Sequence, residues 1–335
     1  MKKFKRILAV FFCLLMAAGV LSGCGKAVSS SEVGTPAAET EKPLRIVTTI
    51  FPEYDWVRQV LGERAEDAEL TMLLDNGVDL HSYQPTADDI IRISDCDLFV
   101  YVGGESDGWV KDALKEATNQ NMKVINLLDV LGEQVKEEEV VEGMEGEEEE
   151  ETDDEGPEYD EHVWLSLKNA GTLCDAIASA LEEIDPANKE VYAANAKNYQ
   201  EKLSALDAEY QSAVDNAARK TILFGDRFPF RYLVDDYGLN YYAAFVGCSA
   251  ETEASFETIS FLAQKVDELK LPCVLTIEGA KHKIAETIVQ NTAEKNQKIL
   301  TLDSMQGTTS KDVENGTTYL SVMEKNLDVL KKALN

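Results

Sequence analysis

Two histidines of this chain stand in short polar segments that suit metal coordination. His81 lies in the run Gly-Val-Asp-Leu-His-Ser-Tyr-Gln-Pro-Thr at 77–86, and His162 follows Asp160 and Glu161 in the run Asp-Glu-His-Val-Trp-Leu. Imidazole is the commonest side-chain ligand for transition metals, and the chain has only 3 histidines among its 335 residues. The sequence therefore predicts a metal site that contains His81 and His162.

Three carboxylates in the second half of the chain each follow a segment that we expect to be a strand: Asp226, Glu278 and Asp303. Ligands of parallel α/β sheets bind beyond the carboxyl ends of the strands, so these side chains and His81 are expected to face one crevice. We predict Asp226 and Asp303 as further metal ligands. Glu278 remains an alternative ligand, or it forms a buried ion pair with Arg227, which is slightly favoured.

The third histidine and the cysteines are weaker candidates for metal ligands. His282 lies between two lysines and is expected to be a surface residue. Cys248 follows a predicted strand, and its side chain faces either away from the crevice, which is favoured, or into it. The sequence does not determine any disulfide pairing. The other cysteines of the predicted folded part are favoured as small buried side chains: Cys96, Cys174 and Cys273.

The N-terminus predicts an exported lipoprotein. A basic start followed by an apolar segment at 7–21 has the composition and length of a secretory signal peptide. The run Leu-Ser-Gly-Cys that ends at Cys24 resembles a bacterial lipobox. We therefore expect a signal peptide at 1–23, lipidation of Cys24, and a mature protein anchored by lipid to the outside of the cytoplasmic membrane. Residues 24–43 have the composition of a flexible linker.

The chain is strongly acidic, with a formal net charge of -30. Such a surface repels nucleic acid and attracts cations, so no nucleic-acid partner is expected. Sixteen of the acidic side chains lie at 136–161, which predicts a solvated loop. Two roles remain open for this acidic loop: it gathers cations weakly, or it only raises solubility.

Predicted strands and helices alternate along the chain after the linker, as in βαβ units with a mostly parallel sheet. They include a helix that begins at Thr86, with Thr86 as its N-cap and Asp89 at the capping-box position, a strand at 239–245 and a helix at 281–295. An apolar periodicity at 186–219 predicts one helix of about 45 Å, which joins two lobes or is an ordinary surface helix. The predicted fold class is α/β, with two lobes that are each a mostly parallel sheet flanked by helices. The lobes are expected at 44–185, including the acidic loop, and at 220–335.

The two histidine segments and the segment around Asp303 resemble motifs of the zinc- and manganese-binding solute-binding proteins of bacterial ABC transporters. The runs at 77–86 and 160–165 are similar to the first two ligand loops of that family, and Thr-Leu-Asp-Ser-Met at 301–305 is similar to the last. The resemblance covers 44–335. It implies a monomeric, non-enzymatic receptor that captures one divalent ion between two lobes and delivers it to an ABC permease.

The resemblance fails at the third ligand. The family normally has His or Glu at a position that falls, counting back from Tyr237 and Gly238, on Arg227. Arginine has no lone pair that could bind a cation. The neighbouring Asp226 is therefore the candidate for the third ligand. The family's loop is usually rich in histidine in zinc members, whereas the acidic loop has none. Three imidazoles favour zinc, and two imidazoles with two carboxylates also suit Mn²⁺ or Fe²⁺. We predict Zn²⁺, with Mn²⁺ or Fe²⁺ as the alternative.

Two other classes of protein have weaker support in the sequence. A secreted zinc metalloenzyme needs an open metal position and a general base, but the sequence has no His-Glu-x-x-His motif and no Gly-x-Ser-x-Gly motif. An adhesin for cell adhesion to host matrix has no direct support in the sequence. Enzymatic turnover would distinguish the first class from a transport receptor.

Overall fold

The structure is a computed structural model that describes residues 42–146, 158–249, 253–279 and 281–335. The predicted signal peptide, the predicted lipidation residue Cys24 and nearly all of the predicted linker lie outside the described residues, as does the middle of the acidic loop. Within the described part of the chain, no helix is both long enough and apolar enough to cross a membrane.

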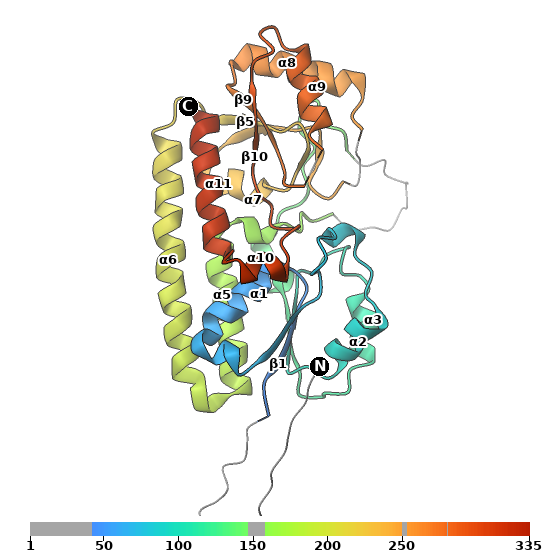
Figure 1. The fold of residues 1–335 in the computed structure, drawn as a ribbon, viewed down its shortest axis with the longest axis vertical. Coiled ribbons are helices and arrows are strands. Elements are labelled where there is room, and N and C mark those ends of the chain that lie inside the picture. Colours follow the sequence, from blue (N-terminus) through green and yellow to red (C-terminus); the bar gives the residue numbers. More distant parts are fainter. Residues whose placement is uncertain (1–41, 147–157, 250–252, 280) are drawn as a thin grey trace, which may run out of the picture. The chain divides into compact units, whose positions relative to one another are not determined.

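A parallel sheet of four strands dominates the first half of the described chain (Figure 1). β1 (Arg45–Thr48) lies between β2 (Glu69–Met72) and β3 (Leu98–Tyr101), and β4 (Lys123–Asn126) pairs with β3. The inner strands β1 and β3 are mostly buried and rich in aliphatic and aromatic residues, as expected for a parallel sheet covered on both faces. The predicted parallel sheet is confirmed in this half.

Helices connect these strands, and α2 (Ala87–Ser94) begins at the cap that the sequence predicts. The Thr86 hydroxyl accepts a hydrogen bond from the backbone N–H of Asp89 at 3.2 Å, and the Asp89 carboxylate accepts from the backbone N–H of Thr86 at 2.8 Å. This is the predicted capping box. The other helices of this half are α1 (Phe51–Leu61), α3 (Val110–Lys115) and the short α4 (Leu127–Leu131), which the sequence does not predict.

One long helix, α6 (Lys189–Asp215), contacts elements from both ends of the chain. It has 27 residues, or about 40 Å at ~1.5 Å per residue. It packs along α5 (Leu167–Ile184) and also contacts α1 and α11 (Tyr319–Leu334), as Figure 1 shows. The predicted long helix is therefore confirmed. Its buried side chains recur every three or four residues: Tyr192, Ala196, Tyr199, Leu203, Leu206, Tyr210 and Val214.

Short parallel strand pairs form the sheets of the second half. The pairs are β5 (Thr221–Leu223) with β7 (Asn240–Tyr242), β6 (Arg227–Phe228) with β8 (Phe245–Val246), and β9 (Cys273–Thr276) with β10 (Lys298–Thr301). The single strand predicted at 239–245 is wrong, because it is divided into β7 and β8. β6 is absent from the prediction, since a strand of two residues has no measurable periodicity.

The helices of the second half lie against these pairs, and α8 and α9 pack against each other (Figure 1). α9 is shorter than the predicted helix at 281–295, and α10 is not predicted by the sequence. The bounds are α7 (Arg231–Tyr237), α8 (Phe256–Leu269), α9 (Lys283–Asn291) and α10 (Ser310–Glu314).

The apolar core joins both halves of the described chain. Residues from Pro43 to Asn335 form one compact unit, and the larger hydrophobic cluster includes Ile46 near its start and Leu334 near its end. A smaller cluster lies around α8 and α9 and includes Leu262. The boundaries of the two lobes and of the connecting helix at 186–219 stay predictions.

The described ends of the acidic loop make regular contacts with the rest of the chain. Glu137 forms an antiparallel bridge with Tyr159, and Glu145 forms a parallel bridge with Phe245 of β8. Between them Met144 is buried. The expectation of a purely solvated loop is therefore wrong for these two ends, because backbone pairing and one buried apolar side chain attach them to the fold.

Replacing Leu203 by alanine tests the role of α6 in stability. Leu203 is 2% exposed, and a buried Leu→Ala change typically costs about 2–5 kcal/mol through lost burial and the cavity that remains. We expect a decrease of that size in the free energy of unfolding, measured by urea denaturation. Val191→Ala, at a position of the same helix that is 43% exposed, is the control and should change the value by less than about 0.5 kcal/mol. Equal losses in both variants would contradict the packing described for α6.

Candidate metal centre

His81 lies on a single turn of 3₁₀ helix, Leu80–Ser82, in the connection that leaves β2. The Asp79 carboxylate accepts a hydrogen bond from the backbone N–H of His81 at 3.1 Å and so caps the turn. Leu80 is 1% exposed and inserts into the core. The cap and the buried leucine together fix the direction of the His81 ring.

His162 lies directly before another short turn, Val163–Leu165, which leads into α5. All three residues of that turn are buried, and so is the histidine. The Asp160 carboxylate accepts from the backbone N–H of His162 at 2.8 Å and lies 3.0 Å from its ring Nδ1. One carboxylate therefore positions both the backbone and the ring of His162.

The two imidazole rings converge although they are 81 residues apart in the chain. The Nε2 atoms of His81 and His162 lie 3.2 Å apart. On the opposite side of the His81 ring, Nδ1 lies 2.8 Å from Ser106 Oγ and 3.5 Å from Glu161 Oε2. Each Nδ1 thus has an oxygen partner within 3.0 Å, and a proton assigned to Nδ1 leaves the Nε2 lone pair of that ring for a cation. Such an arrangement is stabilised by a cation between the rings.

The separation of the Nε2 atoms has the value expected for two ligands of one ion. Two nitrogens that bind zinc tetrahedrally at ~2.0–2.1 Å lie roughly 3.3 Å apart. The observed 3.2 Å matches that value. Carboxylates that hold the Nδ1 atoms of metal-binding histidines are usual in such sites because they fix the tautomer and make the ligand more basic.

The environment keeps the His81 ring neutral. Burial and the neighbouring His162 ring lower the pKa of His81 from 6.5 to about 3, and Asp79 opposes this shift while Arg227 adds to it. A lowered pKa means that the neutral ring persists as the pH falls. The neutral ring is the form that binds a metal.

Cys248 completes a group of three potential ligands. One ligand atom each of His81, His162 and Cys248 lies within 4.8 Å of the others. The cysteine follows β8, where Gly247 contacts the His162 ring. A Cβ atom at Gly247 would lie 3.1 Å from Cε1 of that ring and 2.9 Å from a backbone oxygen, so only glycine fits this approach. The favoured expectation that Cys248 faces away is wrong, because a close approach of the backbone, which sequence patterns do not reveal, turns it toward the histidines.

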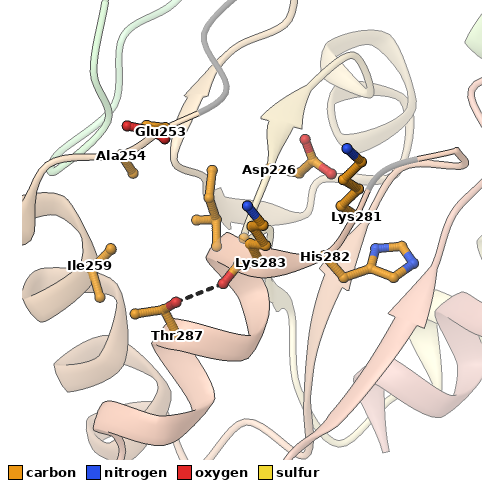
Figure 2. A pocket seen from close by; sticks show the side chains of 10 residues that line it. Asp226, Glu253, Ala254, Ile259, Lys281, His282, Lys283 and Thr287 are labelled. Carbon is orange, nitrogen blue, oxygen red and sulfur yellow. Dashed lines mark hydrogen bonds between the residues drawn. The ribbon is translucent and has the colours of Figure 1, made fainter.

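The structure places the predicted ligand Asp226 in other contacts. Its carboxylate accepts from the backbone N–H of Arg227 at 3.0 Å and of Ile277 at 3.4 Å. Figure 2 shows Asp226 beside Lys281 and Lys283, around a cavity of about 610 Å³. Neither motif histidine is among the described residues that line this cavity. Burial raises the pKa of Asp226.

The predicted ligand Asp303 also has other partners. Its carboxylate accepts from the backbone N–H of Met305 at 2.8 Å, and Asn326 hydrogen-bonds to its backbone N–H and C=O. Burial and the neighbouring Glu278 raise its pKa to about 6. Within the described part of the chain, Asp226 and Asp303 do not join the group of His81, His162 and Cys248. Their metal ligation stays a prediction that requires them to leave these contacts.

Two further expectations are corrected. Among the described residues, Arg227 forms its ion pair with Asp79 and not with Glu278. The Glu278 carboxylate accepts from the backbone N–H and hydroxyl of Ser304 at 2.6 and 2.7 Å, because it caps the loop after β10.

His282 is half-buried at the start of α9 and not a fully exposed residue. The cysteines predicted to be small buried side chains are confirmed as buried and free: Cys96, Cys174 and Cys273.

The fold and the converging histidines define a class of two-histidine, α/β metal-binding proteins. The chain belongs to the family described as zinc-uptake complex component A, periplasmic (ZnuA), which it matches over residues 46–333. It is 33% identical to the zinc-binding lipoprotein AdcA of Streptococcus pneumoniae serotype 4, over 88% of this chain and 56% of that protein. The chain thus spans about half the length of its AdcA relatives.

Two further relatives extend the similarity. The high-affinity zinc uptake system protein ZnuA of Bacillus subtilis is 29% identical over 99% of this chain and 98% of its own length. The crystal structure of the Zn(II)-bound ZnuA-like domain of S. pneumoniae AdcA is 30% identical, with a TM-score of 0.67 over 87% of this chain and 99% of that chain. These comparisons confirm the predicted family and fold class.

Titration of the metal-free protein followed by NMR tests the environment of the His81 ring. We expect its ring signals to stay unchanged over the range of about pH 5 to 8 in which an ordinary histidine changes charge, because burial and His162 lower the pKa of His81. The variant His81→Gln identifies the signals by their loss. A transition of the His81 signals near the ordinary value for histidine would contradict the burial described for this ring.

Proposed function

We propose that this protein is an extracytoplasmic solute-binding lipoprotein that captures one Zn²⁺ ion and delivers it to an ABC permease. The observation that carries the proposal is the 3.2 Å approach of the Nε2 atoms of His81 and His162. Each ring has its Nδ1 next to a hydroxyl or carboxylate oxygen, so both lone pairs are available to one ion. Membership in the zinc-uptake family supports this assignment.

Zinc is the proposed ion because of the donors and the relatives. Neutral imidazole suits zinc and other late transition metals better than it suits Mg²⁺ or Ca²⁺. The S. pneumoniae relative is named as zinc-binding, and a structure of its domain holds Zn(II). Mn²⁺ and Fe²⁺ accept the same donors with added carboxylates and are the alternative cargo. In that case the carboxylates of Asp226 and Asp303 would have to approach the ion between the two histidines.

The proposed location follows from the N-terminus and from the relatives. Cys24 ends a run that resembles a lipobox, and the S. pneumoniae relative is named as a lipoprotein. A diacylated or triacylated cysteine anchors a protein stably to a membrane surface. The receptor would therefore act at the outer side of the cytoplasmic membrane, next to its permease, without any chemical turnover of its cargo.

Replacing His81 by alanine tests the proposed ion site. Because the ring would supply one of the few strong donors, we expect the affinity for Zn²⁺ to fall at least about a hundredfold, measured by competition with a chelator. Circular dichroism should show unchanged helix content. His282→Ala, which changes a half-buried histidine at the start of α9, is the matched control and should bind as before. Unaltered binding by His81→Ala would remove this residue from the site.

Replacing Asp160 by asparagine tests the support of His162. The amide keeps the size of the side chain. It removes the negative charge of the carboxylate oxygen that lies 3.0 Å from Nδ1 of His162. Losing such a partner typically lowers metal affinity by about 10- to 100-fold, and we expect a loss in that range in the same chelator competition. Asp175→Asn, on an exposed position of α5, is the control. Equal affinities of the two variants would show that Asp160 does not tune the site.

A further inference from the structure

Arg227 occupies the position where the sequence comparison with the family expects a third ligand. Its guanidinium forms an ion pair with Asp79, the residue that caps the His81 turn. It also approaches the backbone oxygen of Ser249 at 3.5 Å. Arginine offers no lone pair to a cation. The third donor must therefore come from another residue, unless two histidines alone hold the ion.

Cys248 is the residue best placed to supply that donor. Its sulfur and the ring nitrogens of His81 and His162 all lie within 4.8 Å of one another. In a tetrahedral zinc site with Zn–S of ~2.3 Å and Zn–N of ~2.0–2.1 Å, sulfur and nitrogen lie roughly 3.6 Å apart. A movement of about 1 Å is therefore enough to bring the sulfur into the coordination sphere.

The surroundings hold Cys248 in that place. Its backbone N–H donates to the Glu138 carboxylate at 3.1 Å, and this glutamate belongs to the described start of the acidic loop. Gly247 fixes the approach from the other side, since its backbone leaves no room for a Cβ atom against the His162 ring. The backbone of Cys248 is thus positioned by two neighbouring segments.

Cys248 differs from the other described cysteines. Cys96, Cys174 and Cys273 are buried, as expected for small apolar side chains, whereas Cys248 is only half-buried. Burial and the carboxylates of Asp160, Glu138 and Glu161 raise the pKa of its thiol, so the thiol keeps its proton until a cation compensates the charge of the thiolate. The negative surroundings favour a divalent cation at this point.

We propose, on the basis of the zinc-binding function proposed above, that the Cys248 thiolate is the third protein ligand of the captured ion. The thiol releases its proton to solvent as the Zn–S bond forms, without any redox change. The two imidazoles and the thiolate form a His₂Cys site. Thiolate is a soft ligand that selects zinc over manganese, so Cys248 also gives the receptor its preference for zinc.

X-ray absorption at the zinc edge tests this ligand in the full chain loaded with one equivalent of Zn²⁺. The expected spectrum contains one sulfur at ~2.3 Å besides nitrogen or oxygen at ~2.0–2.1 Å. The sulfur contribution should disappear in Cys248→Ser and persist in Cys273→Ser, which changes a buried cysteine of β9. Bound zinc without sulfur in the unaltered chain, or sulfur that persists in Cys248→Ser, would overturn the thiolate ligand and leave the proposed zinc-binding function intact. Failure of the unaltered chain to bind zinc would overturn that function itself.

The metal preference gives an independent readout. In chelator competition, Cys248→Ser should lower the affinity for Zn²⁺ at least tenfold and the affinity for Mn²⁺ much less, because serine replaces the soft donor by a hard one. Cys273→Ser should leave both affinities unchanged. An equal loss for both ions in Cys248→Ser would show that the cysteine only supports the fold, and this outcome would overturn its role in metal choice.

Discussion

The opposed Nε2 atoms of His81 and His162 are the constraint on which the rest of the site depends. With both Nδ1 atoms protonated, the Nε2 lone pairs, 3.2 Å apart, repel each other, and His162 has no access to water that would compensate, since it is 0% exposed. Burying polar atoms without a partner costs free energy. The chain provides each Nδ1 with an oxygen partner. This arrangement supports the proposed cation site between the two Nε2 atoms.

Contacts between distant segments maintain this arrangement. Trp164, two residues after His162, donates its indole N–H to the backbone oxygen of Ser304 at 2.9 Å, and the Tyr319 hydroxyl donates to the backbone oxygen of Trp164 at 2.6 Å. On the other side, Arg227 pairs with Asp79 of the His81 turn. Each histidine segment is thus attached to the second half of the chain. Any change in how the two halves pack will move the rings relative to each other.

Local signals in the sequence predicted much of the fold. The capping box of Thr86 and Asp89 depends on residues three positions apart, and the apolar spacing of α6 repeats over about six turns. Short elements escaped prediction, because β6 and α4 are too brief to show a period. The division of one predicted strand into β7 and β8 depends on their partners, β5 and β6, which lie elsewhere in the chain.

By itself, the sequence determined the family, the α/β class and the two histidine segments, because these depend on local composition and on motifs of a few residues. The tertiary structure alone decided which donors stand beside the rings. Asp226 and Cys248 both follow strands, yet Asp226 faces a separate cavity and Cys248 faces the histidines. Side-chain direction after a strand reverses with a shift of one residue. That shift is fixed by packing such as the approach of Gly247 to the His162 ring, which no local pattern encodes.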